Sequence, residues 1–500
     1  MQTSAGFVLA AAGALVGSVC VADDLRIHRY EVAVDPALTQ LSINACFDGS
    51  VPHVLTAGSE SATDYLDDLQ LVGNSEGEIR QRRSEVYISS SPESACLRYR
   101  VTMKTPADDD RRHRFTSSFR RVGGDVTAPP SLWLWRPEEL ADDTDIEIMF
   151  RLPAGTAVSA PWRLIWRDGA TATYRVGHAP MHWSAVAAFG SFKVQSLSVP
   201  GGRVRLAVLD AEPVADVAAT RKWLRHAAGA VSSVSGRFPV PDAQMLVVPV
   251  AVGGNPVFSP FGNEENVEPF PFAMITRGGQ PAGIFFIDQR LPLDIFVNDW
   301  VAVHELSHLL HPFLGNSGAW LSEGLASYYQ QVLRGRTGVL SEHDAWLALH
   351  KGFLRGVDGR SGLSLTEASR KRRDRNTYMQ IYWSGAAIAL LADTELRQRS
   401  GGTLSLDVAL SRFQDCCLPA EGRWQARTFM ARLDELVEDD VFSSLYEKYA
   451  NSAEFPDFRA VCRDLGIIAD GDDIRLVETP LADIRRQIMS PGLAAPSREP

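Results

Sequence analysis

One short stretch constrains this chain more than any other. Within the segment VAVHELSHLL, residues 301–310, two histidines stand four positions apart, His304 and His308, and Glu305 directly follows the first. Residues at this spacing lie one above the other on the same helical face, so their two imidazoles can meet one zinc ion. The sequence therefore predicts a helix that forms part of a metal site.

The helix is predicted independently of this motif. Between Val297 and Leu310 no glycine or proline interrupts the chain, and apolar side chains fall on every face, which is typical of a buried helix. Pro312 should end it and makes His311 a helix-terminal histidine. Because an unpaired buried charge costs several kcal/mol, such a helix has little reason to bury two histidines and a carboxylate. A bound zinc ion would offset that cost.

A third ligand is available in a second predicted helix. Catalytic zinc takes three protein ligands and keeps a fourth position for water. Glu323 stands at the start of the segment EGLASYYQQVL, and the short polar loop at residues 315–318 lets the chain reverse and lay this helix against the first. The sequence thus predicts one zinc ion per chain, held by His304, His308 and Glu323.

These segments resemble the zinc metallopeptidases of the gluzincin class. The nearest resemblance is to the glycyl aminopeptidase family, with the aminopeptidase N family more distant, and it rests on HELSH and on SEGLASY, residues 322–328. The segment YWSGAAIALLADTELR, residues 382–397, resembles the Y-x-K-G helix of those families, with Ser384 in place of the usual lysine. By this resemblance Tyr382 is the tyrosine that stabilises the transition state. Its alternative role is packing in the core.

The reaction that this set of residues implies is amide hydrolysis. Zinc would lower the pKa of a bound water toward 7 and polarise the substrate carbonyl, and Glu305 would take the proton of that water and hand it to the leaving amine. Tyr382 would donate a hydrogen bond to the oxyanion. We therefore predict a zinc metallopeptidase acting on peptides. A zinc hydrolase of a non-peptide substrate and a binding protein without activity are the alternatives.

The resembled aminopeptidases hold the free amino group of the substrate with a glutamate, on a strand ahead of the zinc helix. The matching segment is expected within residues 277–288, which contain no glutamate, and Gln280 and Pro281 stand near its place. A neutral amide cannot supply the charge that makes an ammonium worth desolvating. We therefore expect weak aminopeptidase activity or none. Three glutamates of the preceding loop could substitute: Glu264, Glu265 and Glu268.

The charge and the first residues bear on partners and location. The formal net charge is -11 and no long run of Lys or Arg occurs, which argues against nucleic acid as the main partner. Residues 1–22 predict a signal peptide, because their apolar run is too short for a comfortable membrane span and ends at a plausible cleavage site. The mature chain would then be periplasmic or secreted, without a stable membrane span. An uncleaved anchor is the alternative.

Cysteine usage fits export. Cys46 and Cys96 lie in strand-like runs of one presumed domain, and a bridge between them would close a loop of about 50 residues, worth roughly 3 to 4 kcal/mol. Either Cys416 or Cys417 could pair with Cys462. The alternative is that all of these cysteines are reduced.

Apolar periodicity divides the rest of the chain, for which we predict a multidomain α+β fold. Residues 23–200 alternate apolar and polar positions in short runs, which indicates an N-terminal β-sandwich-like domain. Residues 201–400 run strand, helix, strand, strand and metal helix, the order of a thermolysin-like α/β catalytic domain. Residues 401–470 predict a C-terminal helical region, and residues 471–500 a flexible tail.

Overall fold

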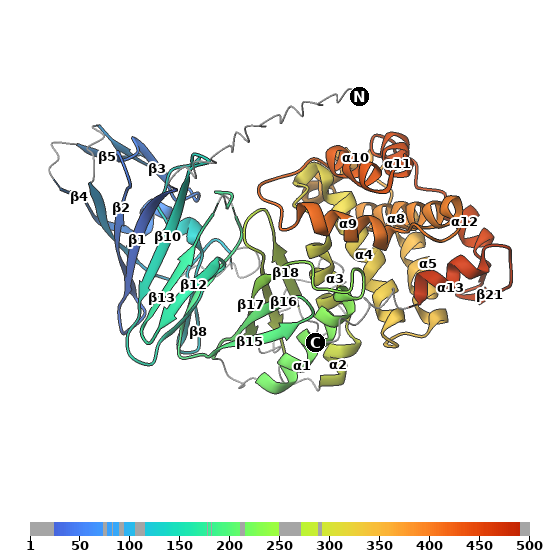
Figure 1. Ribbon diagram of the computed structural model, residues 1–500, viewed down its shortest axis with the longest axis horizontal. Helices are drawn as coiled ribbons and strands as arrows, with labels where there is room; N and C mark the ends of the chain where they lie inside the picture. Colours follow the sequence, from blue (N-terminus) through green and yellow to red (C-terminus); the bar gives the residue numbers. More distant parts are fainter. Residues whose placement is uncertain are drawn as a thin grey trace, which may run out of the picture.

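A five-stranded mixed sheet lies at the centre of the molecule, between a β-rich N-terminal region and a helical C-terminal region (Figure 1). The structure is a computed structural model. It describes residues 25–73, 78–82, 84–89, 95–105, 116–177, 179–181, 183–210, 216–249, 272–288 and 293–490. The predicted signal peptide and the loop glutamates at positions 264, 265 and 268 lie outside these residues. Within the described parts, no helix has both the length and the hydropathy needed to cross a membrane.

The N-terminal region consists mainly of strands, and in several of them the side chains alternate between the core and the surface. Its strands are β1 (Arg26–Val34), β2 (Gln40–Cys46), β3 (Val54–Thr56), β4 (Leu66–Val72), β5 (Ile79–Arg82), β6 (Glu85–Ile88), β7 (Cys96–Thr102), β8 (Arg120–Val122), β9 (Asp125–Ala128), β10 (Thr144–Arg151), β11 (Ala157–Ser159), β12 (Arg163–Asp168), β13 (Thr171–Arg175) and β14 (Ala187–Gly190). Along β1, Tyr30, Val32 and Val34 are buried and the residues between them are less so, the period of a half-buried strand.

These strands form three sheets. A seven-stranded sheet in the order β12-β13-β10-β1-β2-β7-β4 and a four-stranded sheet in the order β11-β14-β9-β8 contribute to one apolar core, and β3-β6-β5 form a third sheet. This arrangement matches the predicted β-sandwich-like domain. A disulfide between Cys46 and Cys96 joins β2 to β7, so the predicted bridge is confirmed.

The central sheet separates two layers. Its strands are β15 (Val194–Val199), β16 (Gly202–Val208), β17 (Asp242–Pro249), β18 (Phe272–Thr276) and β19 (Ala282–Ile287), in the order β15-β16-β17-β19-β18, and helix α1 (Val217–Ser232) connects β16 to β17. Along β17, Met245 and Val247 belong to the core shared with the helices, whereas Leu246 and Val248 pack toward β14 of the N-terminal region. One face of the sheet therefore carries helices and the other carries strands.

The helical region follows the central sheet in sequence. Its helices are α2 (Leu293–Asn298), α3 (Val301–Ser307), α4 (Ala319–Arg336), α5 (Glu342–Asp358), α6 (Leu365–Arg370), α7 (Arg372–Arg375), α8 (Tyr378–Ser400), α9 (Leu406–Cys417), α10 (Ala426–Val437), α11 (Val441–Tyr449), α12 (Phe458–Asp464) and α13 (Ala482–Met489), with a hairpin of β20 (Ile467–Asp470) and β21 (Asp473–Leu476). One core runs from Leu197 to Met489. The multidomain α+β class is confirmed.

Two of the predicted boundaries differ from the structure. Strand β15, predicted for the N-terminal domain, pairs with β16 in the central sheet, so the division precedes residue 194. No division of the core occurs near residue 400, because α8 and α9 contribute to the same core as the metal helix. Alternation along β15 is the same in either sheet, so periodicity alone could not assign it.

The predicted flexible tail is also wrong for its first twenty residues. Strand β21 and helix α13 fall within it, and the side chains of Ile484, Ile488 and Met489 are buried in the core. Arg336 Nε on α4 donates to the carbonyl of Ile488 at 2.9 Å and holds α13 in place. Polar residues outnumber apolar ones in residues 471–490, so the apolar helical face of α13 was not recognised from the sequence. The last ten residues, 491–500, lie outside the described residues.

The predicted single helix from Val297 to Leu310 is interrupted. Helix α2 ends at Asn298, and the backbone N–H of Val301 donates to Asp299 Oδ1 at 2.7 Å, which starts α3 as a separate helix. The last turn, His308–Leu310, is a 3₁₀ turn. An aspartate whose side chain bonds a nearby backbone N–H competes with the helical hydrogen bond at that point.

The predicted pairing of Cys462 is wrong. Cys416 and Cys417 bond to each other at the end of α9, and Cys462 on α12 is a free thiol buried in the helical core. Burial raises the pKa of this thiol to about 12, so it behaves as a small apolar side chain.

Candidate metal centre

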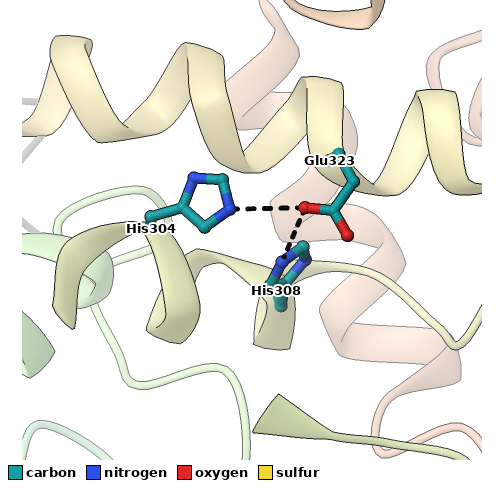
Figure 2. Close-up of side chains that lie close together, drawn as sticks. All are labelled: His304, His308 and Glu323. Atoms are coloured by element: carbon teal, nitrogen blue, oxygen red, sulfur yellow. Dashed lines mark hydrogen bonds and ion pairs between the residues drawn. The ribbon is translucent and has the colours of Figure 1, made fainter. Parts of the chain in front are cut away.

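Two consecutive helical segments bring the three predicted ligands together (Figure 2). His304 lies on α3, His308 begins the 3₁₀ turn that follows, and Glu323 lies in the second turn of α4. The Nε2 atoms of both histidines are 3.4 Å from Glu323 Oε2. One ligand atom from each residue falls within a group no wider than 4.8 Å. Two imidazole nitrogens and a carboxylate oxygen form a donor set typical of catalytic zinc sites.

The outer nitrogen of each histidine has its own partner on α4. His304 Nδ1 lies 3.0 Å from Gln330 Oε1, and His308 Nδ1 lies 3.4 Å from Ser322 Oγ. An acceptor at Nδ1 keeps the proton on that nitrogen and leaves the Nε2 lone pair directed toward Glu323. Both histidines are therefore oriented as ligands, and the three residues fit a metal ion.

Burial and neighbouring charge set the protonation of the ligands. Burial lowers the pKa of His308 to about 4, so its ring is neutral at neutral pH. Burial also acts to lower the pKa of His304, but Glu323 and Glu305 outweigh it and raise that pKa. In Glu323 burial acts to raise the pKa, but His308 and His304 hold it well below its usual range. Glu323 is thus an anion, the form in which a carboxylate binds a metal.

Glu305 faces the edge of the central sheet. Its Oε2 accepts a hydrogen bond from the backbone N–H of Ile275 on β18 at 3.0 Å. Burial raises the pKa of Glu305 to about 7, with the nearby charge of His304 opposing this shift and that of Glu323 adding to it. A carboxylate with a pKa near neutrality can both accept and return a proton.

Tyr382, near the start of α8, lies against the first ligand. Its ring stacks on that of His304, with the centroids 5.8 Å apart and the planes 7° from parallel. Burial raises the pKa of its hydroxyl well above the usual value, and the charges of Glu323 and Glu305 raise it further. The hydroxyl therefore keeps its proton and can act as a hydrogen-bond donor. Ser384, which replaces the lysine of the resembled families, is buried within α8.

Three functional candidates were missed by the sequence interpretation: Arg277, Ser322 and Gln330. All three contact the histidines from outside, so no motif spacing marks them. Helix α4 carries several other polar residues, so polarity alone did not single out Ser322 or Gln330. His311 does not join the three ligands. It is buried, and its Nδ1 lies 3.0 Å from Arg277 Nη1.

The strand beside the metal helix is β18, and the segment at residues 277–288 was wrongly expected to hold that place. Strand β19 within that segment lies one position further into the sheet, because β18 pairs with it antiparallel and forms the edge. Gln280 donates its amide hydrogen to the backbone carbonyl of Asp242, away from the ligands. Strand β18 has the sequence FAMIT, which also contains no carboxylate.

Comparisons with known proteins identify the fold. No family model matches the sequence, and neither does any curated protein. An aminopeptidase N family protein from Idiomarina loihiensis is similar in structure, with a TM-score of 0.58 and 15% identity over 92% of this chain and 78% of that one. The M1 zinc metallopeptidase of Deinococcus radiodurans gives 0.51 and 13% over 87% and 95%. Native yeast LTA4 hydrolase gives 0.54 and 14% over 88% and 70%.

These likenesses confirm the expected resemblance at the level of the fold. The chain has the multidomain fold of the aminopeptidase N family proteins and M1 zinc metallopeptidases, with its three grouped ligands on two of the helices that follow the central sheet. At such low identities the fold alone is shared, so the activity must be argued from the site.

Proposed function

We propose that this protein is a zinc-dependent peptidase in which His304, His308 and Glu323 hold one zinc ion. The observation that carries the proposal is the convergence of these three ligand atoms within 4.8 Å. The fold adds support, because the Deinococcus radiodurans neighbour has been captured with a Tyr-Ser-Ala substrate.

The chemistry divides between the metal and the protein. When bound, zinc supplies Lewis acidity, which lowers the pKa of water and polarises a carbonyl. Glu305 takes a proton from the attacking water and returns it to the leaving amine, a role suited to its pKa of about 7. Tyr382 donates its hydroxyl hydrogen to the oxyanion that develops on the substrate.

The residues of strand β18 bear on whether the free amino end of a peptide is recognised. Without a carboxylate there, the strand beside Glu305 has no group to pair with a substrate ammonium. We therefore propose cleavage within peptides or a preference for another end, with weak aminopeptidase activity or none. The second candidate is an aminopeptidase with a relocated carboxylate, favoured by the aminopeptidase N fold.

The decisive experiment compares free and N-acetylated versions of the same peptides, with and without a chelator. We expect hydrolysis that the chelator abolishes and that N-acetylation leaves nearly unchanged. A strong preference for the free amine, lost in Glu268→Gln or Glu265→Gln, would establish the aminopeptidase instead. Chelator-sensitive activity on other compounds alone would point to a non-peptide substrate.

We also propose that the protein is exported. The support is the Cys46–Cys96 disulfide, because such bridges persist in oxidising compartments. Fractionation of cells that produce the full chain tests this, and recovery in the cytosol with both thiols reduced would contradict it.

A further inference from the structure

Arg277, the residue that follows edge strand β18, reaches behind the metal ligands. Its Nη1 donates to the backbone carbonyl of His308 at 3.0 Å, and its Nη2 donates to Ser322 Oγ at 3.1 Å. Nη1 also lies 3.0 Å from Nδ1 of the buried His311. One guanidinium group thus contacts the end of the metal helix and the start of α4.

The two segments that Arg277 joins are the ones that carry the ligands. His308 is itself a ligand, and Ser322 directly precedes Glu323, although the two contacted residues are 14 positions apart in sequence. A guanidinium holds its donors in a rigid planar fork, so bonds from two of its nitrogens restrict how the segments can move relative to each other. The carbonyl of His308 also lies at the end of a helix, where a cation is favourable.

Ser322 extends this contact to the histidine ring. A hydroxyl oxygen has two acceptor positions. Arg277 Nη2 occupies one, and His308 Nδ1 lies 3.4 Å from the same oxygen, where its N–H can use the other. Arg277 thereby keeps Ser322 in its acceptor role, and that role fixes the tautomer in which His308 presents Nε2 to Glu323.

The backbone around Arg277 is held from two other parts of the molecule. Gly278 has a φ of +91°, and a Cβ there would lie 2.7 Å from the carbonyl oxygen of Gly422 in the loop after α9. The N–H of Gly422 donates to the carbonyl of Gly278 at 2.7 Å. A Cβ on Gly279 would lie 2.9 Å from that of Ala179 in the N-terminal region. Such close packing fixes the origin of the arginine side chain.

We propose that Arg277 is a positioning residue that preorganises the metal site, so that it sets zinc affinity through His308 and Ser322. This inference rests on the proposed zinc site. Loss of partners behind a metal ligand commonly weakens metal binding about 10- to 100-fold. The hydrogen bonds of its guanidinium go to His308, Ser322 and His311, and it is not one of the three ligands.

The test measures the zinc Kd of the full-length protein by competition with a chromophoric chelator, together with the midpoint of thermal unfolding of the metal-free form. Arg485→Met is the matched control. Arg485 is also a buried arginine that donates to backbone carbonyls, with Nη1 2.8 Å from that of Val477, but it lies on α13, well separated from α3 in Figure 1. Both substitutions should lower the midpoint of unfolding.

Of these two substitutions, only Arg277→Met should raise the zinc Kd, by about 10- to 100-fold. Arg277→Lys keeps the charge but not the fork, so its Kd should lie between those of wild type and Arg277→Met. Ser322→Ala should raise the Kd less, and the double variant should bind zinc more tightly than the product of the two single effects implies.

An unchanged Kd in Arg277→Met or Arg277→Lys, with the midpoint lowered as in Arg485→Met, would overturn the inference and leave Arg277 a structural residue. If Arg277→Met does not fold, the Arg277→Lys and Ser322→Ala values decide, and wild-type affinity in both would contradict the inference. Failure of the wild-type protein to bind zinc would be a different result, because it would contradict the proposed function itself.

Discussion

Helix α4 carries two buried polar clusters that are satisfied in different ways. Toward its C-terminal end, the hydroxyl of Tyr329 donates to Asp407 at 2.8 Å, and Arg336 lies 2.8 Å from the other oxygen of that carboxylate. Toward its N-terminal end, Glu323 lies 3.4 Å from each of two histidine nitrogens. Hydrogen bonds between charged groups are usually shorter, roughly 2.7 to 2.9 Å.

The difference shows what each cluster is for. In the first, both carboxylates have short contacts. Tyr328 donates to Asp393 at 2.8 Å and Arg397 donates to the same carboxylate at 2.9 Å, and together with the contacts of Asp407 these bonds hold α4, α8 and α9 together. The second brings donor atoms to within 4.8 Å of one another without short bonds between them, as ligands to a cation are arranged. We therefore expect the first cluster to determine stability and the second to determine metal binding and activity.

The largest expected effect on activity comes from Glu305→Gln, a change beside the second cluster. This substitution removes the proton acceptor and leaves all three ligands in place, so kcat should fall by about 10²- to 10⁴-fold with zinc content unchanged. Metal analysis and steady-state kinetics on the same preparation measure both quantities, and Glu323→Ala, which should lose the metal, is the control. Retention of most of the turnover by Glu305→Gln would show that the roles are misassigned.

Asp407→Asn in the first cluster should lower the stability and leave zinc binding unchanged. It leaves the buried guanidinium of Arg336 without its counter-ion, which typically costs about 3 to 5 kcal/mol. Denaturant unfolding should show this loss, while the zinc Kd of the folded protein stays at the wild-type value. A large change in zinc affinity would mean that the two clusters are coupled along α4.

A smaller effect is expected for Tyr382→Phe. Removing a single donor to the oxyanion should lower kcat by roughly 10²- to 10³-fold and leave the zinc content and the stability nearly unchanged. If kcat were unchanged in a folded variant, Tyr382 would be a packing residue, and Tyr378, one helical turn earlier, would be the next candidate.

The same contrast explains what the sequence could predict. His304, Glu305 and His308 stand in one short motif, and the segments around Glu323 and Tyr382 resemble family patterns. The sequence could therefore name all five as candidates, and the structure brings them close together. The residues themselves could be named because their spacing and patterns are readable along the chain, although their contacts are tertiary.

Contacts that depend on tertiary packing were missed. Arg277 meets Ser322 across 45 positions in sequence, and neither residue is unusual in its own segment. The Cys416–Cys417 bridge was missed because a bond between neighbouring cysteines closes no long loop for the sequence to indicate, and α13 was missed because its apolar face is narrow. Composition and residue spacing say little about which residues far apart in the sequence come into contact in the folded protein.

The zinc content of the purified protein tests the central claim most directly. We expect about one equivalent of zinc per chain after purification without added metal, and close to none in His304→Ala. Near-zero zinc in the wild-type protein, with His304→Ala no different from it, would contradict the assignment of a zinc site to His304, His308 and Glu323.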